Sequence, residues 1–538
     1  MVYAVLLLFN IFTTMVDTAM FPHEYREAAN IFMTKAIVDG DNIYSLDVLK
    51  RNDPGLVYLY GPLESIIASV FVIVLRADIV SVHFAIAFIS LIATAILMAK
   101  MAYDHTNSFL PPALAFLCGI YCHWRYGYIY AAPDSLGLFL IILFLFILSR
   151  RQFKARPYLA AIVIILAFFT KQYFAIGALT GFLYLLFVEK REAIKYAITG
   201  IVISAILSIV ITVKFPLFWT YALYFLKGPG AGMPSSDVAG TAHNVSQVKY
   251  IGGLFICFFI VAFFHLIITV YRVIKKDIVF RPNLKNMDGP LVEIKGDNHF
   301  SFDVLMYIQM LVAAFILYYI GNNEGAFISY YLQLFVPALI LLSVVAMDNI
   351  RISGRIADKV RLPLLITINL LTCLYTINRA EPRLVVTKIA DIDKERWEDF
   401  YNVISDYDHK EVYYVPLGEY PVAFTDKYIY NTGMPFVISE KYLNRYNESE
   451  IAKVLFPHAG EIMQQHLEYR EMLRKNVLDG KYDLIMYTPD MDEIFTTDDM
   501  AGRYKLLSSM PLKAGSWSWE VDLYILKKDT YSMGFDEF

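Results

Sequence analysis

The sequence predicts an α-helical polytopic membrane protein that carries a soluble α/β domain at its C-terminal end. Hydrophobic residues make up 57% of the 538 residues and charged residues only 18%, and the mean hydropathy is +0.48. Long apolar runs recur as far as residue 378, which is typical of membrane-spanning helices. Beyond Arg379 the composition becomes polar. These observations predict a membrane domain over residues 1–379 and a soluble domain over residues 380–538.

Charge and cysteine content narrow the class further. The formal net charge of -4 argues against a nucleic-acid partner, because Lys and Arg occur only in short clusters between apolar runs. All four cysteines lie inside apolar runs, which favours buried thiols over disulfides or a cysteine-based metal site. The run Val2 to Phe12 has no basic residues before it and is expected to be an uncleaved first span.

Basic clusters predict the topology, because Lys and Arg near span ends are retained on the cytoplasmic side. Two apolar runs separate each cluster from the next, so all four clusters are expected inside: 150–156, 190–195, 272–276 and 351–361. This arrangement gives about eleven spans, with the N-terminus inside and the C-terminal domain outside. The expected spans are 1–16, 80–99, 109–122, 136–148, 157–170, 173–188, 193–213, 248–271, 303–320, 327–347 and 363–378.

Two further segments complete the expected architecture. The apolar run 63–75 is shorter than a span and is interpreted as an interfacial helix within one large outer loop over residues 17–79. Past residue 379, the runs Val412–Val415 and Leu484–Tyr487 predict strands, and Glu461–Leu478 predicts a helix. A soluble domain of about 150 residues is large enough to form its own core.

The first outer loop supplies candidate acids. Glu24 and Glu27 are three residues apart and share a face if the segment is helical, with Arg26 near enough to keep one of them ionised. The alternative is that they are solvated charges at a helix start, where the helix dipole favours acids.

The later outer loops add Asp134, Arg125 and Lys171. Asp134 precedes an apolar span, where a simple N-cap is the alternative explanation. Arg125 and Lys171 lie at outer span ends, against the positive-inside bias, and suit either phosphate binding or snorkelling toward headgroups. Two carboxylates and a cation at one membrane face, represented by Glu24, Asp134 and Lys171, indicate chemistry on an anionic lipid.

The order of these features resembles the GT-C superfamily of integral-membrane glycosyltransferases. The motifs are the first-loop acid, Gly40-Asp41-Asn42-Ile43-Tyr44, Tyr60-Gly61-Pro62, Pro133-Asp134 and Thr170-Lys171-Gln172. The segment from Gly321 to Pro337 is similar to a late motif of its bacterial branch, the dolichyl-phosphate-mannose and aminoarabinose transferase-like proteins. The chain departs from the family in carrying His23-Glu24 where many members have an Asp-Glu pair.

The resemblance implies transfer of a sugar from a polyprenyl-phosphate carrier to an acceptor hydroxyl at the outer membrane face, with inversion at the anomeric carbon. Glu24 is expected to be the general base, with Asp17 and Glu27 as alternatives. Asp134 would orient a substrate or share a divalent ion with the first-loop acid. Lys171 would offset charge on the leaving phosphate.

The resemblance also implies a substrate-binding set. This set is Arg26, Arg125, Lys171, Gln172, Tyr60 and Tyr331. The expected partners are a polyprenyl-phosphate sugar, a saccharide, lipid or protein acceptor, and membrane lipids. These residues single out no cofactor, and a divalent metal ion is left open. The implied location is a bacterial inner membrane. His243, in the loop 214–247, is a further candidate ligand with a solvated histidine as its alternative.

Two other classes stay open from the sequence. Intramembrane charges also mark translocation paths, so a lipid or saccharide transporter or flippase is the main alternative. The candidate acids lie at one interface and no inverted repeat is evident, which favours the enzyme. A binding module on a membrane anchor is the third class, although about eleven spans exceed what an anchor needs.

Overall fold

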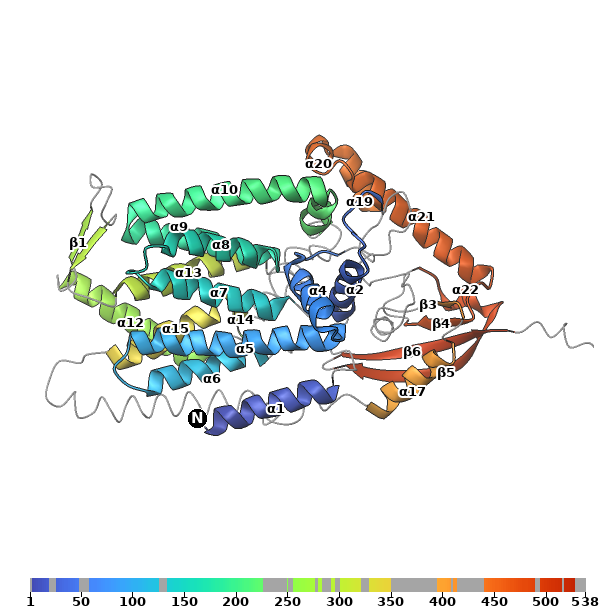
Figure 1. Cartoon of the computed structure of the whole chain (residues 1–538), viewed down its shortest axis with the longest axis horizontal. Coiled ribbons are helices and arrows are strands. Elements are labelled where there is room, and N and C mark those ends of the chain that lie inside the picture. The colour runs from blue at the N-terminus through green and yellow to red at the C-terminus, as the bar shows by residue number, and fades with distance from the viewer. Residues whose placement is uncertain are drawn as a thin grey trace, which may run out of the picture. The chain divides into compact units, whose positions relative to one another are not determined.

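The structure is a computed structural model that is mostly helical, with a small sheet near the C-terminal end (Figure 1). It describes residues 2–18, 26–47, 58–124, 133–225, 249, 255–275, 279–282, 292–295, 300–320, 329–349, 394–407, 410–413, 440–488, 494–514 and 517–527. The chain divides into two compact units. Unit 1 comprises Met1–Met15, Tyr60–Lys214 and Ala231–Val386, and unit 2 comprises Val16–Leu59, Phe215–Gly230 and Thr387–Phe538.

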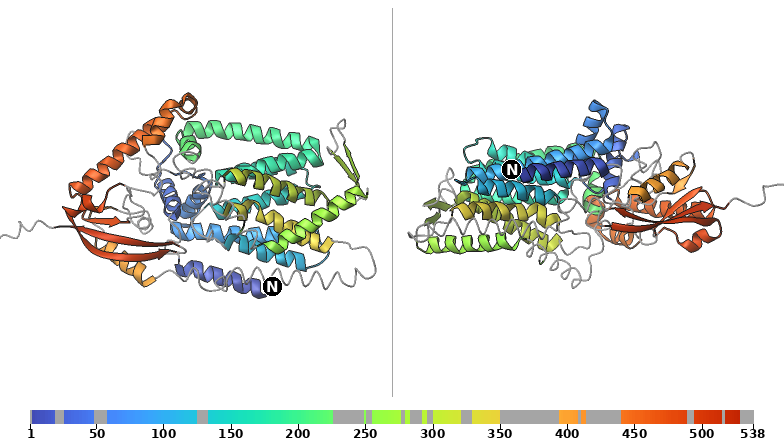
Figure 2. Two further views of the ribbon diagram at one scale, coloured as in Figure 1. Left: turned by 180° about the vertical axis from the view of Figure 1, so that it is seen from behind. Right: turned by 90° about the horizontal axis from the view of Figure 1, so that it is seen from below.

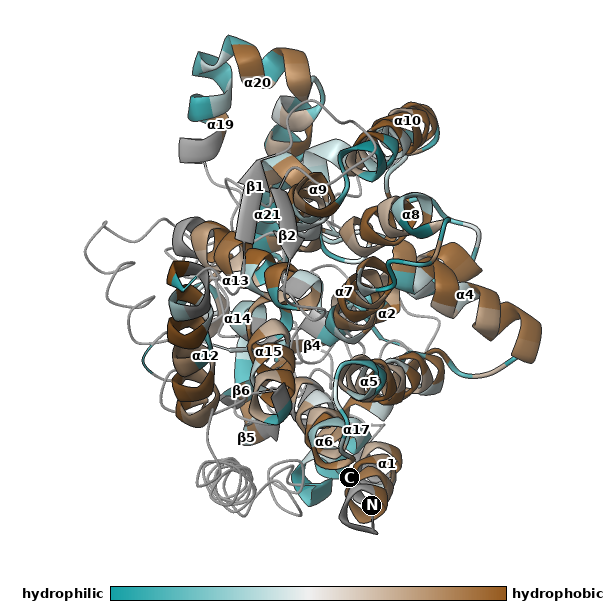
Figure 3. Cartoon of the chain, turned by 90° about the vertical axis from the view of Figure 1, so that its left-hand side faces the viewer, coloured by the Kyte–Doolittle hydropathy of each residue, from teal (hydrophilic) through white to brown (hydrophobic). Residues whose placement is uncertain are grey.

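Unit 1 is a bundle of apolar helices. Its elements are α1 (Val2–Thr18, which begins in this unit), α4 (Leu63–Leu75), α5 (Ile79–Asp104), α6 (Leu110–Trp124), α7 (Asp134–Ser149), α8 (Arg156–Phe168), the 3-10 helix η1 (Gln172–Ala175), α9 (Ile176–Val188), α10 (Lys190–Lys214), α12 (Ile256–Ile274), the strands β1 (Val279–Pro282) and β2 (Val292–Lys295), α13 (Phe300–Ile320), α14 (Ser329–Leu334) and α15 (Val336–Asn349). Helix α5 packs against α6 and α7, α7 against α8, and α13 against α9 and α15. Figure 3 views these helices end-on, with apolar residues in brown.

Local sequence signals explain several helix boundaries. The Asp78 carboxylate accepts a hydrogen bond from the Ser81 backbone N at 2.8 Å and caps α5. Helix α8 has Pro157 in its first turn, where a missing N–H costs nothing. The expected interfacial helix at 63–75 has the same bounds as α4.

The expected spans that lie within the described residues correspond to helices with shifted ends, and the number of spans is not confirmed. Within the described ranges, two helices, α5 and α10, are long and apolar enough to cross a membrane, and shorter apolar helices account for other expected spans. The run 327–347 is divided between α14 and α15. The run 363–378 and the expected domain border at residue 379 lie outside the described residues.

Helix α10 differs from a core helix because its apolar side chains are exposed. Only 6% of the apolar 18-residue stretch of α10 is buried, whereas 56% of the corresponding stretch of α5 is buried. Ile201, Ile209 and Val213 are among the exposed residues. An apolar helix that is not covered by protein requires an apolar surrounding.

Two glycines allow close contacts that shape unit 1. A Cβ atom at Gly61 would lie 2.0 Å from the backbone oxygen of Phe169, and the Leu63 backbone N donates to that same oxygen at 3.0 Å. A Cβ atom at Gly137 would lie 1.9 Å from the ring of Phe174. The absence of side chains therefore lets the residue 60–63 turn and the start of α7 approach the corner between α8 and α9.

Unit 2 is built around a four-stranded sheet (Figure 2). Its elements are α2 (Arg26–Val38), the π-helix η2 (Thr220–Phe225), α17 (Lys394–Ser405), β3 (Val412–Tyr413), α19 (Glu440–Glu448), α20 (Glu450–Leu455), α21 (Ala459–Leu478), β4 (Leu484–Tyr487), α22 (Thr497–Ala501), β5 (Tyr504–Ala514) and β6 (Trp517–Leu526). The strand order is β3-β4-β6-β5, with β3 parallel to β4 and the other pairs antiparallel. The expected strand at 484–487 has the bounds of β4.

Alternation along β4 produces two cores, one on each sheet face. Leu484 and Met486 pack in a cluster with Trp397 of α17 and with Phe32 of α2. Ile485 packs on the opposite face, in a cluster that contains residues of α21 and α22. Because side chains alternate along a strand, four consecutive buried residues serve both faces.

The Gly40 to Tyr44 motif forms a structural turn of unit 2. Gly40 has a φ of 79°, a left-handed conformation that glycine adopts without strain. The Asn42 side-chain oxygen accepts from the Tyr44 backbone N at 3.1 Å. Tyr44 is buried, with its ring 5.4 Å from that of Phe218. The Tyr44 carbonyl accepts from the Leu217 backbone N at 2.9 Å. The described contacts therefore give this motif a role in folding.

We expect Gly61→Ala to destabilise the protein by about 1–3 kcal/mol, because the new methyl group meets a backbone oxygen that cannot rotate away. Gly200→Ala is the matched control, since a Cβ atom added there would meet no heavy atom within 4 Å and α10 is helical at that position. The control should gain about 0.5–1 kcal/mol from helix propensity. Denaturant unfolding in detergent measures both, and equal stability of the two variants would contradict the close contact.

His466 predicts a pH dependence of stability. Its ring is buried in α21, and neither ring nitrogen has a hydrogen-bond partner in the described structure. Burial, with a smaller contribution from the Arg470 charge, lowers the pKa of His466 from 6.5 to about 3. The unfolded chain therefore binds a proton below pH 6.5 while the folded chain does not, so stability is lost as pH falls from 6.5 toward 3.

Between pH 6.5 and pH 5 this loss should be about 1.6 kcal/mol, and His466→Leu should remove it. His458→Leu, at the partly exposed N-cap of α21, is the matched control for the loss of a histidine. Denaturant unfolding of the full chain at both pH values checks the expectation. A His466→Leu chain with the wild-type slope would show that another group is responsible.

Candidate functional site

The most distinctive polar feature of unit 1 is a buried ion pair between Lys171 and Asp134. Lys171 Nζ donates to Asp134 Oδ1 at 3.0 Å and to Oδ2 at 2.9 Å. The residues are 2% and 3% exposed, respectively. Burying two charges is costly, and this geometry offsets much of that cost because one cation serves both carboxylate oxygens.

Local backbone structure presents the two partners. Asp134 is the first residue of α7, where the helix dipole favours an anion. The N-cap itself is Pro133, which has no side-chain cap, so the simple N-cap explanation for Asp134 does not describe the structure. Helix α8 ends at Phe168, and Lys171 is extended, with φ -153° and ψ 129°, before η1 begins. Lys171 therefore lies at the corner that Gly137 allows to pack against α7.

Two neutral groups also contact the Asp134 carboxylate. Gln333 Nε2 donates to Asp134 Oδ1 at 3.1 Å. The Tyr173 hydroxyl lies 3.1 Å from the same oxygen and is also in contact with Gln333 Oε1. Its single proton serves one of these acceptors at a time. The carboxylate, at the start of α7, is thus held by groups from the α8–α9 corner and from α14.

Three tyrosine rings surround the Lys171 ammonium. Its Nζ lies 4.6 Å from the ring centroid of Tyr60, 5.6 Å from that of Tyr173 and 5.9 Å from that of Tyr330. Aromatic faces at these distances attract a cation. Tyr60 reaches Lys171 from the turn that the Gly61 contact with Phe169 holds in place. Lys171 is therefore a buried, paired cation, and snorkelling does not describe it.

The structure brings some of the sequence-predicted site residues together. Tyr60, Asp134 and Lys171 form the pair and its aromatic wall. Gln172 follows Lys171 in η1 and is almost fully buried. Tyr331 lies in the apolar core of unit 1, one position away from Tyr330.

The other predicted residues lie elsewhere. Glu24 and Arg125 are outside the described residues, as is His243. Arg26 begins α2 in unit 2, and Glu27, in the first turn of that helix, is buried. Asp17 lies near the end of α1.

Sequence reasoning did not select Tyr173, Tyr330 and Gln333. Tyr330 and Gln333 belong to the late motif and are three residues apart, so they share a face of α14. The three-residue spacing was the signal available in the sequence, because it places both side chains on the same side of a helix. Tyr173 offered only its proximity to Lys171 in sequence.

Unit 1 contains two further ionisable groupings that sequence reasoning missed, one buried and one partly buried. His83 Nδ1 lies 2.9 Å from Glu64 Oε1, which joins the start of α4 to α5. His265 Nε2 lies 3.4 Å from Asp303 Oδ2, and its Nδ1 lies 2.9 Å from the Tyr307 hydroxyl. The signal was an acid or a histidine inside an apolar run, which marks a candidate functional position.

The arrangement around Asp134 does not fit a divalent ion. Both carboxylate oxygens accept from Lys171, and Oδ1 also accepts from Gln333. Over the described ranges, no group of three or more His, Cys, Asp or Glu side chains could hold a metal. A metal shared through Asp134 would have to compete with these donors for the carboxylate oxygens.

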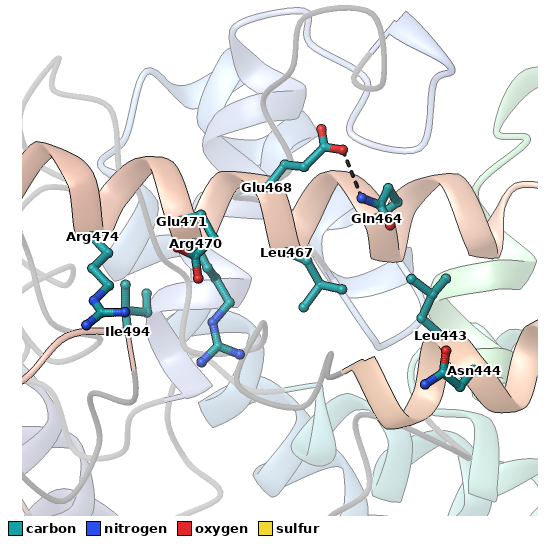
Figure 4. Close-up of a pocket in the computed structure, with 9 residues that line it drawn as sticks. All are labelled: Leu443, Asn444, Gln464, Leu467, Glu468, Arg470, Glu471, Arg474 and Ile494. Carbon is teal, nitrogen blue, oxygen red and sulfur yellow. Dashed lines mark hydrogen bonds between the residues drawn. The ribbon is translucent and has the colours of Figure 1, made fainter.

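Unit 2 contains a separate hollow of about 690 Å³ between α19 and α21 (Figure 4). Its lining residues are Leu443, Asn444, Gln464, Leu467, Glu468, Arg470, Glu471, Arg474 and Ile494. Arg474 is already paired with Asp499 at 3.1 Å, and Gln464 donates to Glu468 at 2.9 Å. Two arginines and two glutamates balance in charge, so the hollow does not define an anion site.

Breaking the ion pair from one side should destabilise unit 1 strongly. Lys171→Met leaves a buried carboxylate and is expected to cost about 3–5 kcal/mol. Combining it with Asp134→Asn should cost less than the sum of the two single changes, with a coupling of about 0.5–3 kcal/mol. Denaturant unfolding of the four chains in one detergent gives this coupling. Additive effects would mean that the pair contributes no mutual stabilisation.

Comparison with known proteins gives structural matches alone. No family model and no curated protein matches the sequence. A crystal structure of ArnT from Cupriavidus metallidurans bound to undecaprenyl phosphate is similar with a TM-score of 0.49 and 10% identity, covering 97% of each chain. The Archaeoglobus fulgidus oligosaccharyltransferase tethered to an acceptor peptide is similar with a TM-score of 0.46 and 12% identity, covering 96% of this chain and 74% of that one.

A second structure of that oligosaccharyltransferase, with Zn and sulfate, has a TM-score of 0.45 and 12% identity, covering 95% of this chain and 72% of that one.

Proposed function

We propose that the chain is a membrane glycosyltransferase that moves a sugar from a polyprenyl-phosphate donor to an acceptor hydroxyl at the extracytoplasmic face, with inversion. The observation that most supports this proposal is the Lys171–Asp134 ion pair. It is assembled from the Tyr60-Gly61-Pro62, Pro133-Asp134 and Thr170-Lys171-Gln172 segments and from the late motif, four segments that the sequence resemblance singles out independently.

Membrane embedding is supported by the exposed apolar surface of α10. A helix of 25 residues is about 38 Å long, which exceeds the hydrocarbon core of a bilayer. The positive clusters then give an inside N-terminus and an outside C-terminal domain. A bacterial inner membrane is the proposed location.

Lys171 is proposed to supply positive charge to the leaving lipid phosphate. Its ammonium lies among tyrosine rings with little water, where a fixed charge acts more strongly than in solution. Asp134 holds the Lys171 ammonium in position until the donor phosphate competes for it. Arg125 is proposed as a second phosphate ligand.

The general base is proposed to be a first-loop carboxylate, with Glu24 as the first choice. Deprotonating the acceptor hydroxyl makes it a nucleophile for the anomeric carbon, while the C–O bond to the phosphate breaks. Glu27 is buried within α2, which favours Glu24 for a role that requires access to the acceptor. Tyr60 and Tyr330 are proposed to stack against the sugar.

A lipid or saccharide transporter is the second candidate. The buried Glu64–His83 pair and the partly buried His265–Asp303 pair favour it, because ionisable groups within apolar helices often line translocation paths.

The test is glycosyl transfer by the purified chain from a panel of radiolabelled polyprenyl-phosphate sugars. Lys171→Met should lower the rate by about 10²–10³-fold through loss of charge stabilisation. Glu24→Gln should lower it by about 10²–10⁴-fold through loss of the base. Asp134→Asn should lower it by freeing Lys171 from its position.

Lys505→Met and Asp479→Asn, two exposed positions of unit 2, are the matched charge controls and should retain wild-type turnover. Lys171→Arg should recover part of the rate, which separates the charge from folding. Failure of every donor to turn over, with lipid movement across proteoliposomes intact, would favour the transporter.

A further inference from the structure

Helix α20 of unit 2 carries an unusual exposed apolar surface. It begins after Ser449, whose side chain caps it, and ends before Phe456. Ile451 is 74% exposed, Val454 79% and Leu455 62%. The sheet cores of unit 2 exclude these three residues, which are called here the α20 ridge.

The ridge occupies one side of the helix. At 100° per residue, Ile451, Val454 and Leu455 fall within about 100° of one another. Lys453 lies on the opposite side and pairs with Glu450 at 2.7 Å. The short helix is therefore amphipathic, with its apolar side unpartnered in the described structure.

Aromatic contacts anchor the end of α20 to η2. The ring of Tyr224 in η2 lies 5.3 Å from that of Phe456, the residue that follows α20, and 5.8 Å from that of Tyr446. The Tyr446 hydroxyl donates to the Phe456 carbonyl at 3.0 Å. These contacts lie within unit 2 and tie the ridge to the segment around Tyr224.

That segment directly follows the exposed apolar helix α10. Thr220, the first residue of η2, comes six residues after Lys214, so the chain can separate them by at most about 20 Å. Lys214 is the end of α10 that the positive-inside pattern places outside. Trp219 and Tyr224 are residue types typical of the membrane–water boundary.

We propose that the α20 ridge inserts into the outer leaflet of the bilayer, at the boundary between headgroups and acyl chains. This inference rests on the membrane embedding in the proposed function. Lipid is the occupant that the tether favours, because the aromatic cluster joins the ridge to η2, which begins six residues after the proposed spanning helix α10. The inserted ridge docks the sheet domain on the surface where the lipid-linked donor lies.

Spin labels on the full chain in phosphatidylethanolamine–phosphatidylglycerol nanodiscs test the proposal. Single cysteines replace Ile451, Val454, Lys453 or Ile201, in a background where the four native cysteines are alanine. Oxygen, which concentrates in lipid, should collide severalfold more often than a water-soluble nickel chelate with labels at Ile451 and Val454. Lys453 is the matched control on the same helix and should show the reverse preference.

The spin label at Ile201 on α10 distinguishes failure of this inference from failure of the proposed function. A lipid-exposed Ile201 with ridge labels accessible to the nickel chelate would overturn ridge insertion and leave α10 embedded. Ridge labels shielded from both reagents would overturn it too, because protein, such as a second copy, would then cover α20. A water-exposed Ile201 would remove the membrane basis of the proposed function itself.

Discussion

The buried Lys171–Asp134 ion pair is the interaction on which the organisation of unit 1 depends. Two charges can remain inside an apolar bundle only if they neutralise each other and their remaining polar atoms find partners. This requirement joins the start of α7, the α8–α9 corner and α14. The tyrosines around Lys171 add a favourable surface for the cation without adding charge. A polar site thereby exists within a predominantly apolar fold.

Close backbone packing makes the ion pair geometrically possible. Gly61 accommodates the Phe169 carbonyl where any Cβ would collide, and Gly137 accommodates the Phe174 ring in the same way. Both contacts draw neighbouring segments onto the residues around Lys171. The two glycines therefore contribute to the site through the volume that they leave free, while the ionic and aromatic groups supply its chemistry.

The two units satisfy their apolar residues in different ways. Unit 2 buries both faces of its sheet beneath helices, as the alternating residues of β4 show. Unit 1 buries an interior but leaves much of α10 apolar and exposed, which calls for an apolar medium. The α20 ridge is a small part of unit 2 that also leaves apolar side chains exposed. The proposed membrane placement accounts for both exposed surfaces with one surrounding medium.

The sequence by itself determined the features that depend on local composition: the apolar helices, the α4 bounds and the β4 strand. It also selected Tyr60, Asp134 and Lys171 as candidate site residues. The periodicity of apolar residues and the placement of Lys and Arg depend on residues that are close in the sequence, so both can be recognised without the structure. Tertiary structure decided that Lys171 pairs with a residue 37 positions away and that Gln333, 199 positions from Asp134, completes the site. Those partners depend on which helices pack together, and no local pattern specifies that packing.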